Sequence, residues 1–177
     1  MDISPNRLRP VIIGTFTISD ISIMPIINFV NLFCCAGIIL GGALGSIFYN
    51  RQLSNFNQKI TIKDGAIMGL LAGILSAIIV TGINLLMVLY SNINPINEIL
   101  EAVNTFSKDL PQEVYDQMKH FSDEFERYGY SPTLTLVSLI INIVIYPLFA
   151  SIGGIIVAMI NINRKKLIGE NIGGEIL

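Results

Sequence analysis

Charged and chemically reactive side chains are scarce in this sequence. Only 14% of its 177 residues are charged, and it contains one histidine, His120, and two cysteines, Cys34 and Cys35. A lone histidine without a nucleophile partner supports no catalytic triad, and two adjacent cysteines with no histidine or carboxylate nearby cannot supply the four ligands of a zinc site. We therefore expect no metal and no cofactor, and we expect both cysteines to serve as small buried apolar residues.

The sequence motifs of the common enzyme classes are also missing. The chain has no Gly-x-Ser-x-Gly nucleophile motif, no His-Glu-x-x-His motif and no phosphate-binding P-loop. It has no basic stripe of the kind that binds nucleic acid either. We expect a protein that is not an enzyme and that does not bind nucleic acid.

Apolar residues are abundant instead. They make up 52% of the chain, and the mean hydropathy is +0.64, which is too apolar for an ordinary soluble domain. Two apolar runs, at about 66–90 and 133–162, each exceed the roughly 20 residues that a helix needs to cross ~30 Å of hydrocarbon. The composition therefore predicts an integral membrane protein, with the lipid bilayer as its surroundings.

The first apolar run, residues 11–49, is too long for a single crossing. One straight helix over it would measure roughly 58 Å, about twice the thickness of the hydrocarbon core. Pro25 removes a backbone donor and disfavours helix at the residue before it, so we predict a short helix at about 10–24 and a full span at about 27–49. The total is four membrane segments, of which the first is short or re-entrant because about 15 residues cover only ~22 Å.

Charge is unevenly distributed along the chain. Acidic residues gather between positions 91 and 131, whereas basic residues flank the apolar runs: Arg7, Arg9, Arg51, Lys59, Lys63, Arg164, Lys165 and Lys166. By the positive-inside rule, both termini and the 50–64 loop are predicted to be cytoplasmic, and residues 91–131 to lie outside the cell membrane.

This topology divides the chain into four parts. Residues 1–64 are predicted to form an N-terminal membrane hairpin and a basic cytoplasmic loop, and residues 65–90 a membrane helix. Residues 91–131 are predicted to form an acidic helical hairpin outside the membrane. Residues 132–177 are predicted to form a membrane helix and a basic tail. The expected fold is an all-α, polytopic membrane helix bundle with an extramembrane helical hairpin.

Small residues recur at every fourth position in three of the apolar runs, which places them on one face of each helix. In lipid, close backbone contact through small residues is a leading means of helix association. Packing inside the bundle is the preferred role, with self-association of copies and a glycine-lined pore as alternatives. The predicted helix-packing residues are Gly37, Gly41, Gly42, Gly45, Gly65, Gly69, Gly73, Ala150, Gly153, Gly154 and Ala158.

A few polar residues interrupt the apolar runs: Asp20, Asn28, Asn31, Asn84 and Asn142. Asparagine is costly in hydrocarbon, so each is expected to face protein and to bond across helices. Asp20 is either a membrane-embedded carboxylate or, as we prefer, a turn or interfacial residue. Asp64 is expected to cap the start of the helix that follows it.

The acidic region has its own helical pattern. Asn94 and Pro111 are typical of helix starts, and apolar residues follow each at steps of three and four. We predict helices over 95–107 and 111–128, ended by Gly129. Their apolar faces pack on each other or on the membrane face; the alternative is a docking surface on the 95–128 hairpin for another membrane protein or for a second copy.

Several short motifs carry a resemblance. They are Pro25-Ile-Ile-Asn28, Asn31-Leu-Phe-Cys-Cys35, Gly41-Gly42-Ala43, Asp64-Gly-Ala-x-x-Gly69-x-x-Ala-Gly73 and Gly153-Gly154. With these motifs the membrane part of the chain resembles a group of small archaeal multi-pass membrane proteins of unknown function. The resemblance implies the fold and supplies no activity.

Two functions follow as expectations. The preferred one is a non-enzymatic membrane scaffold or accessory subunit, because small-residue stripes and an outer hairpin are surfaces for association. The alternative is a small channel or transporter component, which the glycine faces, the broken first segment and Asp20 would serve.

Overall fold

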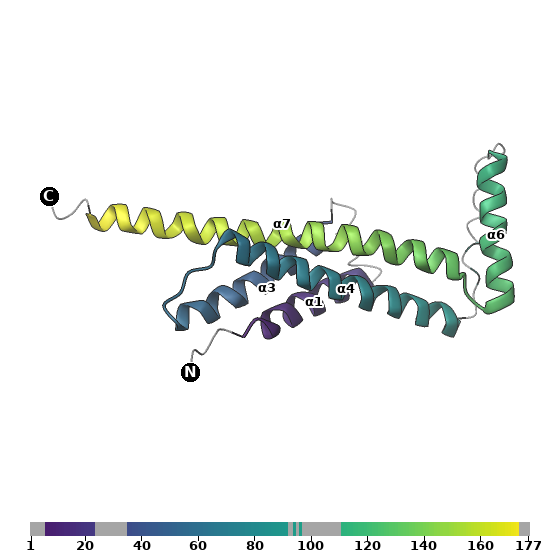
Figure 1. Ribbon diagram of the computed structural model, residues 1–177, viewed down its shortest axis with the longest axis horizontal. Coiled ribbons are helices and arrows are strands. Elements are labelled where there is room, and N and C mark those ends of the chain that lie inside the picture. Colours follow the sequence, from purple (N-terminus) through teal and green to yellow (C-terminus); the bar gives the residue numbers. More distant parts are fainter. Residues whose placement is uncertain (1–5, 24–34, 92–93, 95, 97–110, 174–177) are drawn as a thin grey trace. The chain divides into compact units, whose positions relative to one another are not determined.

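The computed structural model describes residues 6–23, 35–91, 94, 96 and 111–173, with side chains as far as residue 163. This part of the chain contains five helices and no strand: α1 (Leu8–Ile23), α3 (Ala36–Asn55), α4 (Ile62–Ser91), α6 (Gln112–Tyr128) and α7 (Pro132–Gly173) (Figure 1). The predicted all-α class is confirmed for these residues.

The chain forms two compact units. The first comprises residues up to Val80 together with residues from Asn142 onward, and the second comprises Thr81–Ile141. The first unit thus holds α1, α3, the first part of α4 and the later part of α7. The second unit holds α6 with the remaining parts of α4 and α7.

Two of the helices are long and apolar enough to cross a membrane. They are α4 and the Pro132–Asn163 part of α7, which correspond to the predicted spans at 66–90 and 133–162. The other helices in the described part of the chain are not both long enough and apolar enough to cross a membrane. Helix α1 has only 16 residues, and α3 ends in a polar stretch that includes Arg51. The total of four membrane segments stays a prediction.

The second predicted helix, at 27–49, has different bounds in the structure. Cys35 has φ 57° and ψ 30°, a left-handed conformation that interrupts a right-handed helix, so α3 begins only at Ala36. It then continues past the predicted end to Asn55, which leaves residues 56–61 as the loop instead of 50–64. The predicted break at Pro25, with Asn28 and Asn31, lies outside the described residues.

The start of α4 corrects the role expected for Asp64. The N-cap is Thr61, whose Oγ1 accepts a hydrogen bond from the Asp64 backbone N–H at 3.1 Å. The Asp64 carboxylate in turn accepts bonds from the Thr61 N–H at 3.2 Å and from its hydroxyl at 2.7 Å. The pair is a capping box with aspartate in place of the usual glutamate, and it satisfies two backbone donors that a helix start leaves open.

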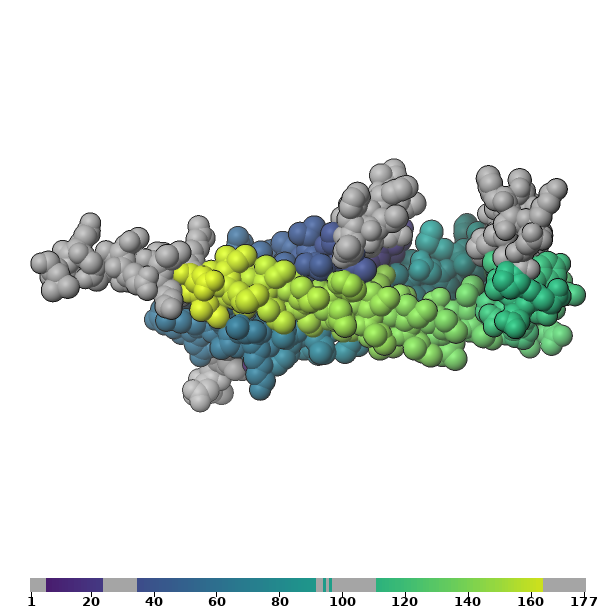
Figure 2. Space-filling model, turned by 90° about the horizontal axis from the view of Figure 1, so that it is seen from above, coloured from purple at the N-terminus to yellow at the C-terminus, as the bar shows by residue number. Residues whose placement is uncertain are grey.

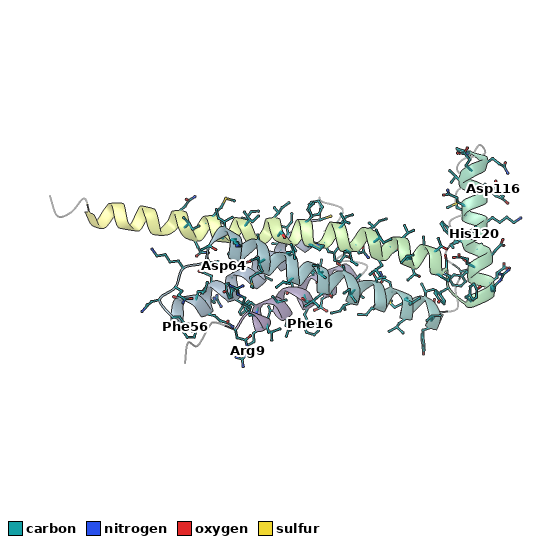
Figure 3. The ribbon with its side chains drawn as sticks, in the orientation of Figure 1. Arg9, Phe16, Phe56, Asp64, Asp116 and His120 are labelled. Atoms are coloured by element: carbon teal, nitrogen blue, oxygen red, sulfur yellow. The ribbon has the colours of Figure 1, made fainter. Side chains whose placement is uncertain are left out.

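In the first unit, many of the buried residues are small and many large apolar residues are exposed, although Ile18, Tyr49 and Met68 are buried as well. Ala72, Ala150 and Ala158 are fully buried, and so are several glycines and serines of the same helices. Leu8 and Phe16 of α1 are exposed, and Figure 3 shows Phe16 on the outer side of its helix. A soluble monomer rarely exposes so many large apolar side chains.

In the second unit, α6 occupies nearly the residues predicted for the second hairpin helix, 111–128. It ends at Gly129, which has φ 76° and whose N–H bonds to the Phe125 carbonyl at 2.8 Å. Glycine adopts this left-handed conformation without the penalty of a Cβ. Of the first predicted hairpin helix, 95–107, all but Ile96 lies outside the described residues; Ile96 itself is buried.

Candidate functional site

The most closely packed part of the first unit is the contact between α4 and α7. A Cβ added at Gly73 would meet the Pro147 backbone, one at Gly69 the Ala150 carbonyl group, and one at Gly65 the Gly154 carbonyl group. Each of these separations would be below 3.0 Å, which real Cβ atoms essentially never show. Residue numbers fall along α4 as they rise along α7, so the two helices run antiparallel.

The same stretch of α7 also contacts α3. A Cβ at Gly42 would overlap the Ala150 carbonyl group, and one at Gly153 would overlap the Ile39 carbonyl group. Ala150 therefore lies between a glycine of α3 and a glycine of α4. Figure 2 shows this part of α7 lying between the two helices.

The contact between α1 and α3 involves a different face of α3. Gly41 and Gly45 lie against Gly14, and a Cβ at Gly14 would be 3.1 Å from the Gly41 carbonyl oxygen. A Cβ at Gly45 would be 3.0 Å from the Pro10 carbonyl oxygen. Gly14 was not among the predicted packing residues, because the positions four residues before and after it are Pro10 and Ile18 and do not form a stripe of small residues.

The structure therefore places the predicted small residues on three helix–helix contacts within one chain. Ala158 is also buried, beside Gly65, and Gly37 is buried in α3. Each glycine in a helix lowers stability by roughly 0.5–1 kcal/mol relative to alanine. The close approach of neighbouring helix backbones is what can offset this cost. Their role in holding the bundle together stays a prediction, because no measurement of assembly bears on it.

Hydroxyl groups in the same core bond to backbone carbonyl groups of neighbouring helices. Ser76 donates to the Thr15 carbonyl oxygen at 3.1 Å and to that of Ala72 at 2.7 Å. Ser151 donates to the Ala66 carbonyl oxygen at 3.3 Å. These hydroxyls thus donate their hydrogen bonds to backbone carbonyl groups of the bundle.

Charged and polar side chains meet at one end of the first unit. The Arg7 Nε donates to the Tyr49 hydroxyl at 3.2 Å, and its Nη2 lies 3.5 Å from the Asp64 carboxylate. The Asn50 amide donates to Asn161 at 3.0 Å. The residues of these contacts are 42, 57 and 111 positions apart, so no local pattern in the sequence could have found them.

Of the polar residues proposed as functional, three lie in the described part of the chain. Asp20 is exposed on α1, Asn84 is exposed on α4, and Asn142 is half-buried in α7. The expectation that Asn84 faces protein and not lipid stays a prediction. Asn28 and Asn31 lie outside the described residues.

The second unit has a polar corner around Glu124, which sequence reasoning missed. Its carboxylate accepts hydrogen bonds from the Ser131 and Thr133 hydroxyls, both at 2.5 Å, and from the Thr133 N–H at 3.1 Å. His120 Nε2 lies 3.3 Å from the same carboxylate. The bonds from Ser131 and Thr133 lower the pKa of Glu124 because they favour its ionised form.

Ser131 has a second role in this corner. Its hydroxyl accepts a hydrogen bond from the Leu134 N–H at 3.1 Å, so it caps the start of α7, and Pro132 is the first helical residue. The carboxylate of Glu124 thus lies at the positive end of the α7 dipole. The arrangement fixes a turn between two helices and leaves the carboxylate bonded to groups of its own chain.

Residues that could share a metal ion are not grouped in the described ranges: no set of three or more histidine, cysteine, aspartate or glutamate side chains is placed to hold one. Cys35 lies at the start of α3, and Cys34 lies outside the described residues.

Comparisons with known proteins found no relative of this chain. No family model, no curated protein and no solved structure matches this chain. The resemblance to small archaeal membrane proteins therefore stays a prediction.

Proposed function

We propose that this chain is a multi-pass integral membrane protein that serves as a non-catalytic scaffold or accessory subunit. The observation that carries the proposal is the arrangement of the first unit, with glycine and alanine between the helices and leucine, isoleucine and phenylalanine on the surface.

The outward apolar stripes support a lipid environment. On α1 the exposed residues Leu8, Ile12 and Phe16 recur every fourth position, and on α3 the exposed residues are Leu40, Leu44 and Phe48. Soluble monomers rarely expose contiguous apolar patches larger than a few hundred Å². Lipid chains would cover these stripes at no hydrophobic cost, whereas water would not.

These stripes are also the reason to place α1 and α3 in the membrane beside α4 and α7. Neither helix is long and apolar enough by itself to cross a membrane, but each combines an outward apolar face with an inward face that includes small residues. A short helix can lie within the bilayer where its polar ends meet protein or the interface. The proposed topology has four membrane segments, cytoplasmic termini and residues 91–131 outside.

A role in association is favoured over chemistry. The polar side chains described above bond to one another or to backbone groups and form helix caps and contacts. Outside the bundle, α6 is strongly amphipathic and exposes Val114, Tyr115 and Tyr128. A partner protein or a second copy would use this outer region.

Topology is tested by cysteine labelling. Asp116→Cys, on α6, and Lys59→Cys, in the loop between α3 and α4, are both at exposed positions. In intact cells a membrane-impermeant maleimide should label the variant at 116 and not the variant at 59, and both should react after lysis. The unaltered chain measures the background from Cys34 and Cys35. Equal labelling of both positions in intact cells would contradict the topology, and release of the chain by alkaline carbonate would contradict membrane integration.

Function is tested by the native mass of the protein extracted gently from its own membranes. A defined oligomer or a stoichiometric membrane partner is the expected result. Truncating the apolar side chains of α6 at Val114 and Tyr115 should weaken that assembly without releasing the chain from the membrane. A well-folded monomer without a partner would contradict the scaffold proposal.

A further inference from the structure

A narrow groove lies between α1 and α4 in the first unit. Its volume is about 230 Å³, and it is lined by Arg7, Leu8, Val11, Leu71, Ile74 and Leu75. Sites for drug-sized ligands measure roughly 300–1,000 Å³ and present several polar groups, so this groove suits a slimmer ligand. Its lining is apolar, because Arg7 contributes only carbon atoms to it, and the Arg7 guanidinium lies beside the groove.

The groove is open to the surroundings of the bundle. Leu71 is 40% exposed and Leu75 is 42% exposed, one turn apart on α4, and Leu8 is exposed on the α1 side. A ligand could therefore enter sideways between the two helices. Lateral entry is the route available to a molecule that already lies in the bilayer.

The cation is held at a defined place. Arg7 is anchored by its bond to Tyr49 and by its contact with Asp64, yet 54% of its side chain is exposed. The Asp64 contact is long, at 3.5 Å, and the Asp64 carboxylate also accepts two shorter bonds from Thr61. A guanidinium has five N–H donors and pairs well with phosphate oxygens, so it can bind a further anion while it keeps these contacts.

We propose that this groove binds one acyl chain of an anionic phospholipid from the surrounding membrane, with the lipid phosphate against Arg7. The proposal rests on the membrane location proposed above. An apolar groove beside an exposed guanidinium matches the two parts of such a lipid, and neither a soluble anion nor an uncharged lipid would use both. Basic residues near a membrane surface attract anionic headgroups with ~1 kcal/mol each.

Arg9 provides a matched control for the charge. It lies two residues from Arg7 at the same end of α1, is exposed, and does not line the groove (Figure 3). Arg7→Gln and Arg9→Gln remove the same charge from the same helix end. The first should affect a lipid bound in the groove more than the second.

Leu71 and Ile78 provide a matched pair for the apolar part. Both are exposed on α4, seven residues apart and so on nearly the same side of the helix, but only Leu71 lines the groove. Leu71→Trp would fill the groove and leave Arg7 in place, whereas Ile78→Trp adds the same bulk two turns further along.

The measurement is native mass spectrometry of the full chain in detergent, after exchange with phosphatidylglycerol or with phosphatidylcholine of the same acyl chains. We expect one retained phosphatidylglycerol for each chain and about fivefold less phosphatidylcholine. Arg7→Gln should reduce retention of phosphatidylglycerol about fivefold. Leu71→Trp should also reduce it, because the indole fills the groove, whereas Arg9→Gln and Ile78→Trp should each reduce it less than the variant they control.

Three outcomes would overturn the proposal. They are equal retention of the two lipids, equal loss for Arg7→Gln and Arg9→Gln, or full retention after Leu71→Trp. If Arg7→Gln does not fold, Leu71→Trp and its control still decide. A chain that resists extraction by alkaline carbonate but shows no lipid preference would refute this site alone, whereas a chain that carbonate releases would refute the membrane location as well.

Discussion

The two units of this chain are held together in different ways. In the first unit, α3, α4 and α7 approach so closely that a single methyl group at Gly42, Gly65 or Gly69 would overlap a neighbouring backbone. In the second unit, the turn from α6 to α7 is held by side-chain hydrogen bonds to the Glu124 carboxylate. Packing in the first unit thus depends on the shape of the contacting helices, and the turn in the second unit depends on the charge of the Glu124 carboxylate.

The two units should therefore respond differently to substitution. Where two helix backbones are in contact, an added methyl group meets backbone atoms and not a flexible side chain that could move aside. Such a contact cannot adjust to added volume. A hydrogen-bonded corner tolerates changes of volume but depends on the ionisation of one carboxyl group. Substitutions that add volume to the first unit or remove charge from the second separate the two effects.

The largest effect is expected from adding one methyl group to α4. A Cβ at Gly69 would lie 2.5 Å from the Ala150 carbonyl carbon, whereas a Cβ at Gly82 would have nothing within 4 Å. Gly69→Ala should therefore lower the free energy of unfolding by ~3 kcal/mol or more, as overpacking against backbone does. Gly82→Ala should raise it by ~0.5–1 kcal/mol, because alanine is the better helix former. Denaturation followed by circular dichroism in mild detergent measures both.

The two substitutions are chemically identical and lie in one helix, so each is the control for the other. Equal effects would mean that the contact between α4 and α7 does not hold the first unit together. A gain of stability from Gly69→Ala would contradict the close approach itself.

A smaller effect is expected at the polar corner. Glu124→Gln keeps an acceptor for the Ser131 and Thr133 groups but removes the charge that strengthens their bonds, so it should lower the thermal midpoint by less than Gly69→Ala. Glu126→Gln removes the same charge from an exposed position of α6 and should have little effect. A drop of equal size for both variants would show that net charge, and not the corner, is responsible.

The smallest effect is the dependence of this corner on pH. The hydrogen bonds from Ser131 and Thr133 lower the pKa of Glu124 below its ordinary value of 4.5. The stabilisation they provide is therefore complete above pH 4.5 and is lost as the pH falls through the lowered pKa of the folded state. Thermal midpoints measured from pH 6 to pH 3 should fall more in the unaltered chain than in Glu124→Gln. Parallel curves would contradict the assignment.

The helices themselves were largely predictable from the sequence, because their signals are local. Apolar runs without internal charge predicted spans at 66–90 and 133–162, close to α4 and to the apolar part of α7. Pro111 and Gly129 predicted the ends of α6 within a residue or two. The prediction failed at Cys35, because no residue type there announces a left-handed conformation, and at Asn50 and Arg51, whose polarity indicated a loop although they lie in α3.

The candidate site was predictable only as a list of small residues. Spacing placed Gly41 and Gly45 on one stripe, but it did not show that they face α1 while the adjacent Gly42 faces α7. Gly14 and Arg7 were not proposed at all. Their importance comes from residues tens of positions away in the chain.

Helical structure, apolar character and the spacing of small residues could all be read from the sequence, because propensity, hydropathy and period are properties of neighbouring residues. The three-dimensional arrangement alone shows which glycines meet, which carboxylate joins α6 to α7, and that Arg7 borders an apolar groove between α1 and α4. Those features arise where distant segments approach one another, and their distances depend on the packing of whole helices.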